Sequence, residues 1–180
     1  QDPVRGDVVV FTPRVNPSKK YLIKRVIGMP GDVLRIEWGF VWIQQEGTSS
    51  FTKLDESDYL MASNIGNTCV RYPQGSRECA PSEKNERYEY RIPEGKYFLM
   101  GDNRAQSLDS RACFGWIGGC RIYREAQFVP RSQIQGKVLL SLGHFDIVDR
   151  IFPPKKGEFD WVIEPRWRDI PKSHLYEELQ

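Results

Sequence analysis

Two adjacent cations, Lys24 and Arg25, interrupt the apolar stretch YLIKRVIG at residues 21–28. Side chains alternate along a strand, so Lys24 points to one face and Arg25 to the other. The remaining neighbours are apolar on both faces, which predicts a strand that is buried on both sides. An edge strand, whose long side chains reach water, is the plainer alternative.

A lysine such as Lys24, held over an apolar surface, loses the hydration of its charge, and this lowers its pKa. Lowering a lysine pKa from about 10.4 towards neutrality takes about 3 units, or roughly 4 kcal/mol. The neutral amine can act as a general base or as a Schiff-base nucleophile. Arginine does not deprotonate in proteins, so we expect Arg25 to anchor a carboxylate instead.

The polar stretch GDNRAQSLDSR, residues 101–111, is the second group of side chains that could do chemistry. It contains two Asp, two Arg, one Asn and two Ser with almost no apolar content. Such a stretch is most often a solvated loop. The same side chains can also hold one another rigidly through charge-assisted hydrogen bonds, which favours a preorganised site loop.

Three stretches in chain order, RGDVVVF (5–11), IKRVIGMPGD (23–32) and GDNRAQSLDSR, resemble the motifs of bacterial type I signal peptidases. IPEGKYFLM (92–100) and FVPRSQIQGKV (128–138) look like two further segments of that family, so the resemblance covers residues 5–140 or so. The family consists of membrane-anchored serine endopeptidases that use a Ser-Lys dyad in place of Ser-His-Asp. They release secretory proteins by cutting after the signal peptide.

The resemblance implies that Lys24 is the general base and that Ser107 donates or accepts a hydrogen bond that orients the Lys24 amine. A preprotein signal peptide would bind as an extended strand beside the Lys24 strand. Its small residues would enter shallow pockets lined by Val10, Leu22 and Ile23.

The resemblance also implies two ion pairs that support the site. Arg25 would pair with Asp102, and Asp109 would pair with Arg111 to brace the loop. The chemistry needs no cofactor and no metal.

The family's nucleophilic serine lies in a Ser-Met-x-Pro segment upstream of RGDVVVF, whereas this chain has no Ser-Met pair and no serine before Ser18. We therefore expect the nucleophile and the second oxyanion donor to be missing, the chain to be a piece of a longer anchored protein, and the chain alone to be inactive. Ser107 is disfavoured as a substitute nucleophile because the family role already explains it.

Several alternatives remain at this point. The chain could be a catalytically dead homologue that binds peptides or regulates another protein. A conjugation-type maturation peptidase or a self-cleaving repressor domain would keep the lysine strand and process a different substrate. A secreted β binding module would make the motif matches coincidental.

Alternation and turn residues predict a mostly β fold with no long amphipathic helix. The expected strands span residues 7–12, 21–27, 33–37, 40–44, 87–92, 97–100 and 134–142, with Trp38-Gly39 as a hairpin turn and a bulge near Gly136. Residues 159–170 are expected to form a short strand or extended chain.

We expect a single signal-peptidase-type domain over residues 1–180, made of a catalytic β core and a loop-rich cap insertion. The core is assigned to residues 1–44 and 87–150, and the cap to residues 45–86. Residues 112–127 are predicted to be a hairpin insert, and residues 151–180 a C-terminal extended segment.

The four cysteines favour two local disulfides, Cys69–Cys79 and Cys113–Cys120, although three pairings could be drawn. Free thiols and a metal site are the alternatives, and the spacings match zinc ribbons poorly. Disulfides would place the chain outside the cytosol. This agrees with the implied location at the cell membrane, with the catalytic domain on the periplasmic or extracytoplasmic side.

Composition excludes few classes of function. The net charge is +2 in 180 residues, and no basic stripe supports a nucleic-acid partner. No apolar run approaches the ~20 residues of a membrane span. A membrane lipid surface is still expected as a partner, through Phe114, Trp116 and Ile117 of the predicted hairpin, whereas Trp161 and Trp167 could equally fill the core.

Overall fold

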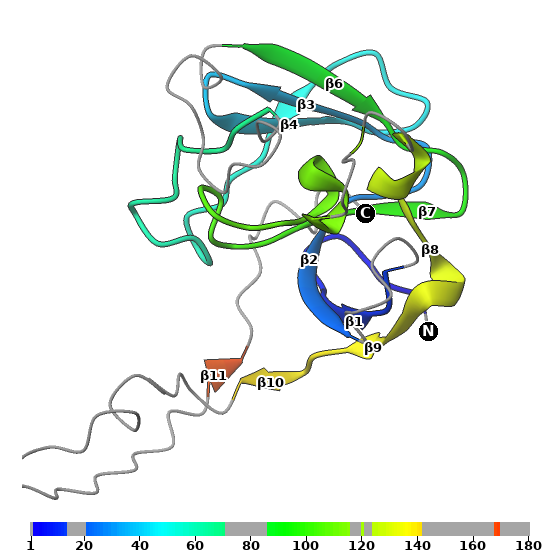
Figure 1. Cartoon of the computed structure of the whole chain (residues 1–180). Coiled ribbons are helices and arrows are strands. Elements are labelled where there is room, and N and C mark those ends of the chain that lie inside the picture. Colours follow the sequence, from blue (N-terminus) through cyan, green and yellow to red (C-terminus); the bar gives the residue numbers. More distant parts are fainter. Residues whose placement is uncertain are drawn as a thin grey trace, which may run out of the picture.

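The computed structural model describes residues 2–13, 21–70, 86–115, 120, 124–141 and 168–169. Its strands form a five-stranded antiparallel sheet in the order β8-β7-β2-β1-β9 and a four-stranded antiparallel sheet in the order β5-β4-β3-β6. Figure 1 shows the two sheets as separate layers. The mostly β prediction is confirmed.

The five-stranded sheet contains β1 (Val8–Phe11), β2 (Leu22–Gly28), β7 (Lys96–Met100), β8 (Val129–Pro130) and β9 (Ile134–Lys137). The four-stranded sheet contains β3 (Val33–Glu37), β4 (Phe40–Gln44), β5 (Thr52–Lys53) and β6 (Arg87–Arg91). A separate pair joins β10 (Leu140–Ser141) to β11 (Arg168–Asp169). Short 3-10 turns cover Ser110–Gly115, Arg124–Gln127 and Arg131–Gln133.

The β3–β4 hairpin turns at Trp38 and Gly39, which have φ values of 53° and 79°. Positive φ at both central residues is the condition for the hairpin turn whose twist matches that of the strands. The two strands then alternate, with Leu34, Ile36 and Val41 among the buried side chains. Both strands have the predicted bounds.

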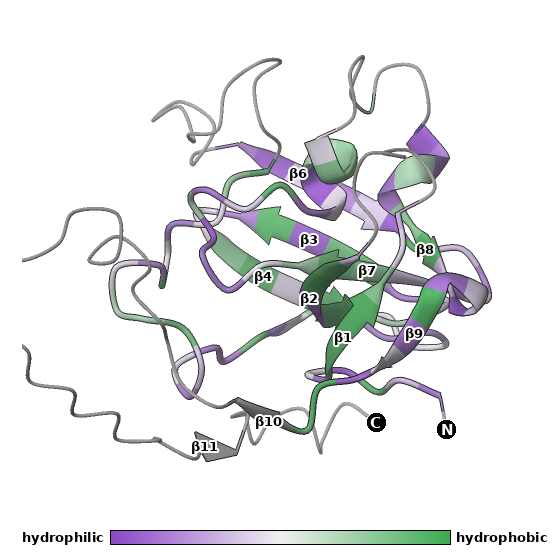
Figure 2. Ribbon diagram, turned by 60° about the horizontal axis from the view of Figure 1, so that its bottom comes forward, coloured by the Kyte–Doolittle hydropathy of each residue, from purple (hydrophilic) through white to green (hydrophobic). Residues whose placement is uncertain are grey.

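The two sheets pack on a shared hydrophobic cluster, since Ile27, Phe98 and Met100 of the five-stranded sheet join the buried face of the four-stranded one. A second cluster lies among β1, β2, β7 and the segment around Phe114. In Figure 2, β1 and β7 are mostly hydrophobic and β6 is mostly hydrophilic. This packing fixes β2 and the loop after β7 relative to each other.

Strand β2 is buried only over its second half, so the prediction of burial on both sides is wrong for the first half. Residues 25–28 are buried, whereas Ile23 is 58% exposed. The reason is the pairing: β1 pairs with β2 from Leu22 to Arg25, but β7 pairs with it only from Arg25 onward. The start of β2 therefore has a neighbouring strand on one edge only, within the described part of the chain.

The expected strand at residues 134–142 is divided into β9 and β10. The register between β1 and β9 shifts opposite Gly136 and Ile134, which confirms the predicted bulge. The predictions for Trp116, Ile117, Trp161, Trp167 and Cys79 fall outside the described residues. Among the residues that are described, no helix has the length and apolarity needed to span a membrane.

Candidate active site

An open pocket of about 290 Å³ lies where β2 meets the loop after β7. Strands β1 and β2 contribute Val8, Ile23, Lys24 and Arg25, and the loop contributes Gly101, Asp102, Asn103 and Ser107. The two stretches singled out in the sequence therefore form one site. Val10 and Leu22 are not among the lining residues, and Leu22 packs against the second hydrophobic cluster.

Lys24 and Ser107 line this pocket together. Lys24 is partly buried and lies opposite Val9 in the β1–β2 pairing. The Ser107 side chain is 8% exposed, and its Oγ has no hydrogen-bond partner among the described residues. The predicted Ser107–Lys24 hydrogen bond is thus not formed in this structure, although both side chains are at the pocket.

Gly101 allows the loop to approach this closely. A Cβ atom at Gly101 would lie 2.0 Å from Ser107 Oγ and 3.6 Å from Lys24 Cδ. Any larger residue would occupy the space that Ser107 fills, so glycine is required for the shape of the pocket.

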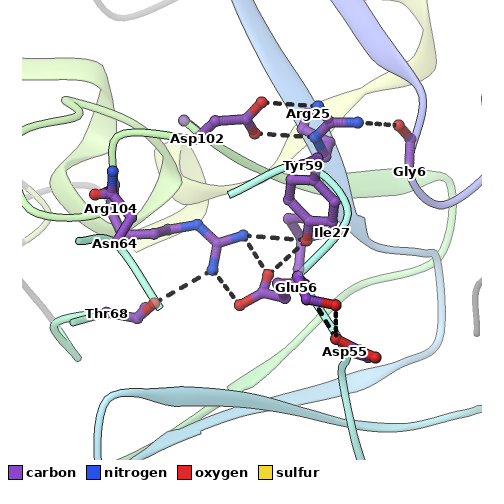
Figure 3. A network of polar contacts seen from close by, with 12 residues as sticks. Gly6, Arg25, Ile27, Asp55, Glu56, Tyr59, Asn64, Thr68, Asp102 and Arg104 are labelled. Atoms are coloured by element: carbon purple, nitrogen blue, oxygen red, sulfur yellow. Dashed lines mark hydrogen bonds and ion pairs between the residues drawn. The ribbon is translucent and has the colours of Figure 1, made fainter. Parts of the chain in front are cut away.

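The buried Arg25 side chain pairs with Asp102 as predicted. Its Nε donates to Asp102 Oδ1 at 2.9 Å, and its Nη2 donates to Oδ2 at 2.7 Å. Its Nη1 donates to the Gly6 carbonyl at 3.0 Å, and the Tyr59 ring lies 4.1 Å from its Cζ (Figure 3). The second of the two adjacent cations is therefore an anchor between β2 and the loop.

Asp109 and Arg111 form the predicted ion pair, with both side chains 0% exposed. Arg111 Nη2 donates to Asp109 Oδ2 at 2.7 Å, and the same oxygen accepts from the Gly101 amide at 3.0 Å. Arg111 Nη1 also donates to the Arg104 carbonyl at 3.0 Å. These bonds connect the beginning, middle and end of the loop.

Arg104 makes the contacts that sequence reasoning missed. Its fully buried guanidinium pairs with Glu56, with Nη1 donating to Oε2 at 2.8 Å and Nη2 to Oε1. Nη1 also donates to Thr68 Oγ1 at 3.2 Å, and the Arg104 amide donates to Asn64 Oδ1 at 2.8 Å (Figure 3). Glu56, Asn64 and Thr68 all lie in residues 45–86, which the sequence analysis assigned to the loop-rich cap.

One feature of the sequence could have predicted that Arg104 pairs with a carboxylate outside the loop. The two Asp of the loop are expected to pair with Arg25 and Arg111, and this leaves Arg104 in need of a carboxylate from elsewhere. The sequence therefore indicates that Arg104 has an acidic partner. It does not indicate which residue this is, because residues 45–86 contain several Asp and Glu and no pattern that distinguishes one of them.

The first motif, RGDVVVF, is joined to the second by another buried ion pair. Arg5 Nη1 donates to Asp32 Oδ2 at 2.8 Å and to the Ile27 carbonyl at 2.6 Å. Asp32 Oδ2 also accepts from the Met29 amide at 2.7 Å, which closes the Pro-Gly turn after β2. The polar residues that flank β2 thus fix its end.

The Cys113–Cys120 disulfide is present, with 5.4 Å between the Cα atoms. Cys69 is also disulfide-bonded, and its predicted partner lies outside the described residues. Phe114 contradicts the predicted lipid-facing tip: it is 1% exposed and packs edge-on against Phe11, with 5.0 Å between ring centroids. Cys113 and Phe114 both have positive φ, and the second hydrophobic cluster contains Phe114.

Among the described residues, no group of His, Cys, Asp and Glu could hold a metal ion. The pocket contains a lysine amine and a buried hydroxyl, and ion pairs fix the strand and the loop that carry them. A lysine amine and a hydroxyl at one pocket are side chains that general acid–base catalysis can use.

Comparisons with known proteins agree with this chemistry. Residues 1–142 match the model of the family described as "Signal peptidase, peptidase S26". A signal peptidase I of Rickettsia akari (strain Hartford) is 34% identical over 144 residues, covering 72% of this chain and 52% of the relative. A signal peptidase I of Rickettsia massiliae (strain Mtu5) is 36% identical over 144 residues, with the same coverage.

The chain spans about half the length of the curated relatives that it matches. The crystal structure of a signal peptidase I from Enterococcus faecalis V583 is 26% identical, with a TM-score of 0.47, and covers 77% of this chain and 97% of that one.

Proposed function

Because the chain belongs to the signal peptidase family, peptidase S26, over residues 1–142, we propose that it carries the catalytic base of a type I signal peptidase. The proposed enzyme is a serine endopeptidase that cleaves signal peptides from secreted preproteins at the membrane, with its catalytic domain on the extracytoplasmic side. The observation that carries the proposal is the pocket that Lys24 and Ser107 share.

In the proposed reaction, Lys24 removes the proton from a nucleophilic serine hydroxyl as that hydroxyl attacks the scissile carbonyl. The protonated Lys24 gives this proton to the leaving amine as the peptide bond breaks and the acyl-enzyme forms. The neutral Lys24 then removes a proton from the water that attacks the acyl-enzyme and returns it to the serine oxygen as the ester bond breaks. The Ser107 hydroxyl turns to the amine and orients it. The nucleophilic serine belongs to the segment that the family carries upstream of RGDVVVF, so this chain supplies the base and its support.

The substrate would bind along the edge of β2 that β7 leaves open. Strand β7 pairs with β2 from Arg25 onward, and among the described strands none continues that edge beside Leu22–Lys24. An extended peptide can add there through main-chain hydrogen bonds. Val8 and the exposed Ile23 line the adjacent pocket and offer apolar contacts to small side chains. The lipid surface next to the cleavage site is the second proposed partner.

The test uses two proteins: the chain alone, and the chain joined behind the segment that precedes the matched region in the Rickettsia akari relative. We expect the joined protein to cleave a preprotein at its signal peptide and the chain alone to leave it intact. Lys24→Ala should abolish cleavage by the joined protein. Lys24→Arg should abolish it as well, because arginine keeps its charge.

Activity of Lys24→Arg above about a hundredth of the unmodified level would contradict the general-base role. Cleavage by the chain alone would place the nucleophile within this sequence, and Ser107→Ala would then show whether it is Ser107. A joined protein that folds and cuts no preprotein would contradict the proposed function.

A further inference from the structure

Residues 56–69, named here the clamp segment, contact both walls of the pocket. One wall is β2 with Lys24, and the other is the loop with Ser107. The clamp segment itself is not part of the pocket lining.

Tyr59 makes the contact with the first wall. Its ring lies 4.1 Å from the Cζ atom of Arg25, which is buried and adjacent to Lys24 in β2. A guanidinium over an aromatic face is attracted to it, and more strongly where water is excluded. Tyr59 therefore holds the strand from which Lys24 extends.

Glu56 makes the contact with the second wall through its ion pair with Arg104. Arg104 lies in a turn in which the Asn103 carbonyl accepts hydrogen bonds from the Gln106 amide at 3.3 Å and the Ser107 amide at 3.0 Å. Fixing Arg104 therefore fixes the turn that ends at Ser107.

Two hydrogen bonds join the two contacts (Figure 3). The Tyr59 hydroxyl donates to Glu56 Oε1 at 2.6 Å, and it accepts from Arg104 Nη2 at 3.4 Å. From these contacts we infer that Glu56 and Tyr59 are positioning residues, which set the spacing between Lys24 and Ser107 without touching the substrate. The inference rests on the proposed peptidase function, since it assigns these residues to that reaction.

Apolar contacts alone would be enough to hold the clamp segment against the rest of the fold. Replacing a buried ion pair by well-packed apolar residues is often neutral or stabilising, so the Glu56–Arg104 pair is a poor device for stability alone. A carboxylate that accepts from a tyrosine hydroxyl and from a guanidinium fixes directions as well as distance. Fixed directions and distances are what is needed to hold Lys24 and Ser107 at a constant spacing.

The test compares Tyr59→Phe and Glu56→Gln in the joined protein. Tyr59→Phe keeps the ring over Arg25 and removes the bonds of the hydroxyl to Glu56 and Arg104. Glu56→Gln keeps the size of the side chain but replaces one accepting oxygen by a donor. We expect kcat to fall about tenfold in each variant, with KM within about twofold of the unmodified protein. Tyr88→Phe and Glu89→Gln on β6 are the matched controls and should leave both constants unchanged.

A second measurement needs no cleavage. The chain alone is treated briefly with a trace of acetic anhydride, and the acetylation of Lys24 relative to Lys96 is measured by mass spectrometry. If Tyr59→Phe loosens the pocket, this ratio should rise several-fold while the melting temperature stays near that of the unmodified chain. General unfolding would instead raise the acetylation of both lysines.

An unchanged kcat in Tyr59→Phe and Glu56→Gln, or an unchanged Lys24 to Lys96 ratio in Tyr59→Phe, would overturn the inference. If Glu56→Gln does not fold, Tyr59→Phe decides the question alone. Should the unmodified joined protein fail to cleave, the proposed function fails, and the acetylation ratio still decides whether the clamp segment positions Lys24.

Discussion

Replacing Gly101 by alanine tests whether the shape of the pocket depends on the close approach of the loop to itself. The new Cβ would lie 2.0 Å from Ser107 Oγ and 2.5 Å from Ser107 Cβ. Carbon atoms in contact lie about 3.5–4.0 Å apart, so Ser107 has to move by at least about 1 Å. The backbone at Gly101 is outside the left-handed region, so alanine adds no backbone strain there.

Two effects of different size should follow. Overpacking a well-filled site costs about 1–3 kcal/mol of unfolding free energy, which lowers the melting temperature by roughly 2–12 °C in a domain of this size. A displacement of about 1 Å at a catalytic group can cost about a hundredfold in rate. We therefore expect a modest loss of stability in Gly101→Ala and a severe loss of signal-peptide cleavage in the joined protein.

Gly136→Ala is the matched control, because its Cβ would meet no atom within 4 Å and its φ is also ordinary. It should change stability by less than about 0.5 kcal/mol and leave cleavage unchanged. Adding Ser107→Gly to Gly101→Ala should restore the melting temperature but not the activity, since the contact is relieved while the hydroxyl is lost. If Gly101→Ala cleaves normally at an unchanged melting temperature, the reasoning about the pocket is refuted.

Two further predictions concern ion pairs. Asp109→Ala leaves the buried Arg111 without its carboxylate, so unfolding free energy should fall by about 3–5 kcal/mol together with cleavage; lost cleavage at an unchanged melting temperature would refute the bracing role. The hydrogen bond from Arg87 is the main cause that holds the pKa of Glu89 below its ordinary value, against the raising effect of burial. Glu89 therefore stabilises the fold above its ordinary pKa, and this contribution is lost as the pH falls through the lowered pKa. Unfolding by urea across the acidic range should show a shallower loss of stability in Glu89→Gln, and identical pH profiles would contradict this.

Local patterns in the sequence were sufficient to predict most of the longer strands, but not the two-residue strands β5 and β8 or the division of residues 134–142 into β9 and β10. Strands β3 and β4 have the predicted bounds because strict alternation and the Trp38-Gly39 turn act over neighbouring residues only. The exposure of Ile23 was missed because it depends on where β7 begins to pair, which is a matter of sheet register. Phe114 was assigned to a surface tip because of its glycine neighbours, whereas its contact with Phe11 is formed only by the folded chain.

The ion pairs of the site were predicted, but the Ser107–Lys24 hydrogen bond is not formed in the structure, and Val10 and Leu22 do not line the pocket. The Arg25–Asp102 and Asp109–Arg111 pairs followed from the resemblance, and both are present. Glu56 could not be found in the same way, because it lies in a stretch with neither periodicity nor a motif. Its role depends on a fold that brings two polar loops together, and a polar residue in a loop reads as solvated when the sequence is considered alone.

The residues that line and support the pocket are far apart along the chain, and this has a consequence for folding. Arg25 and Asp102 are 77 residues apart, and Glu56 and Arg104 are 48 apart. Contacts of such high contact order form slowly, because the chain must close long loops before it gains any energy from them. We expect the β3–β4 hairpin to form early and the pocket around Lys24 to form only in the last steps of folding. A chain that had not reached its native state would then have Lys24 without the loop that forms the other wall of the pocket.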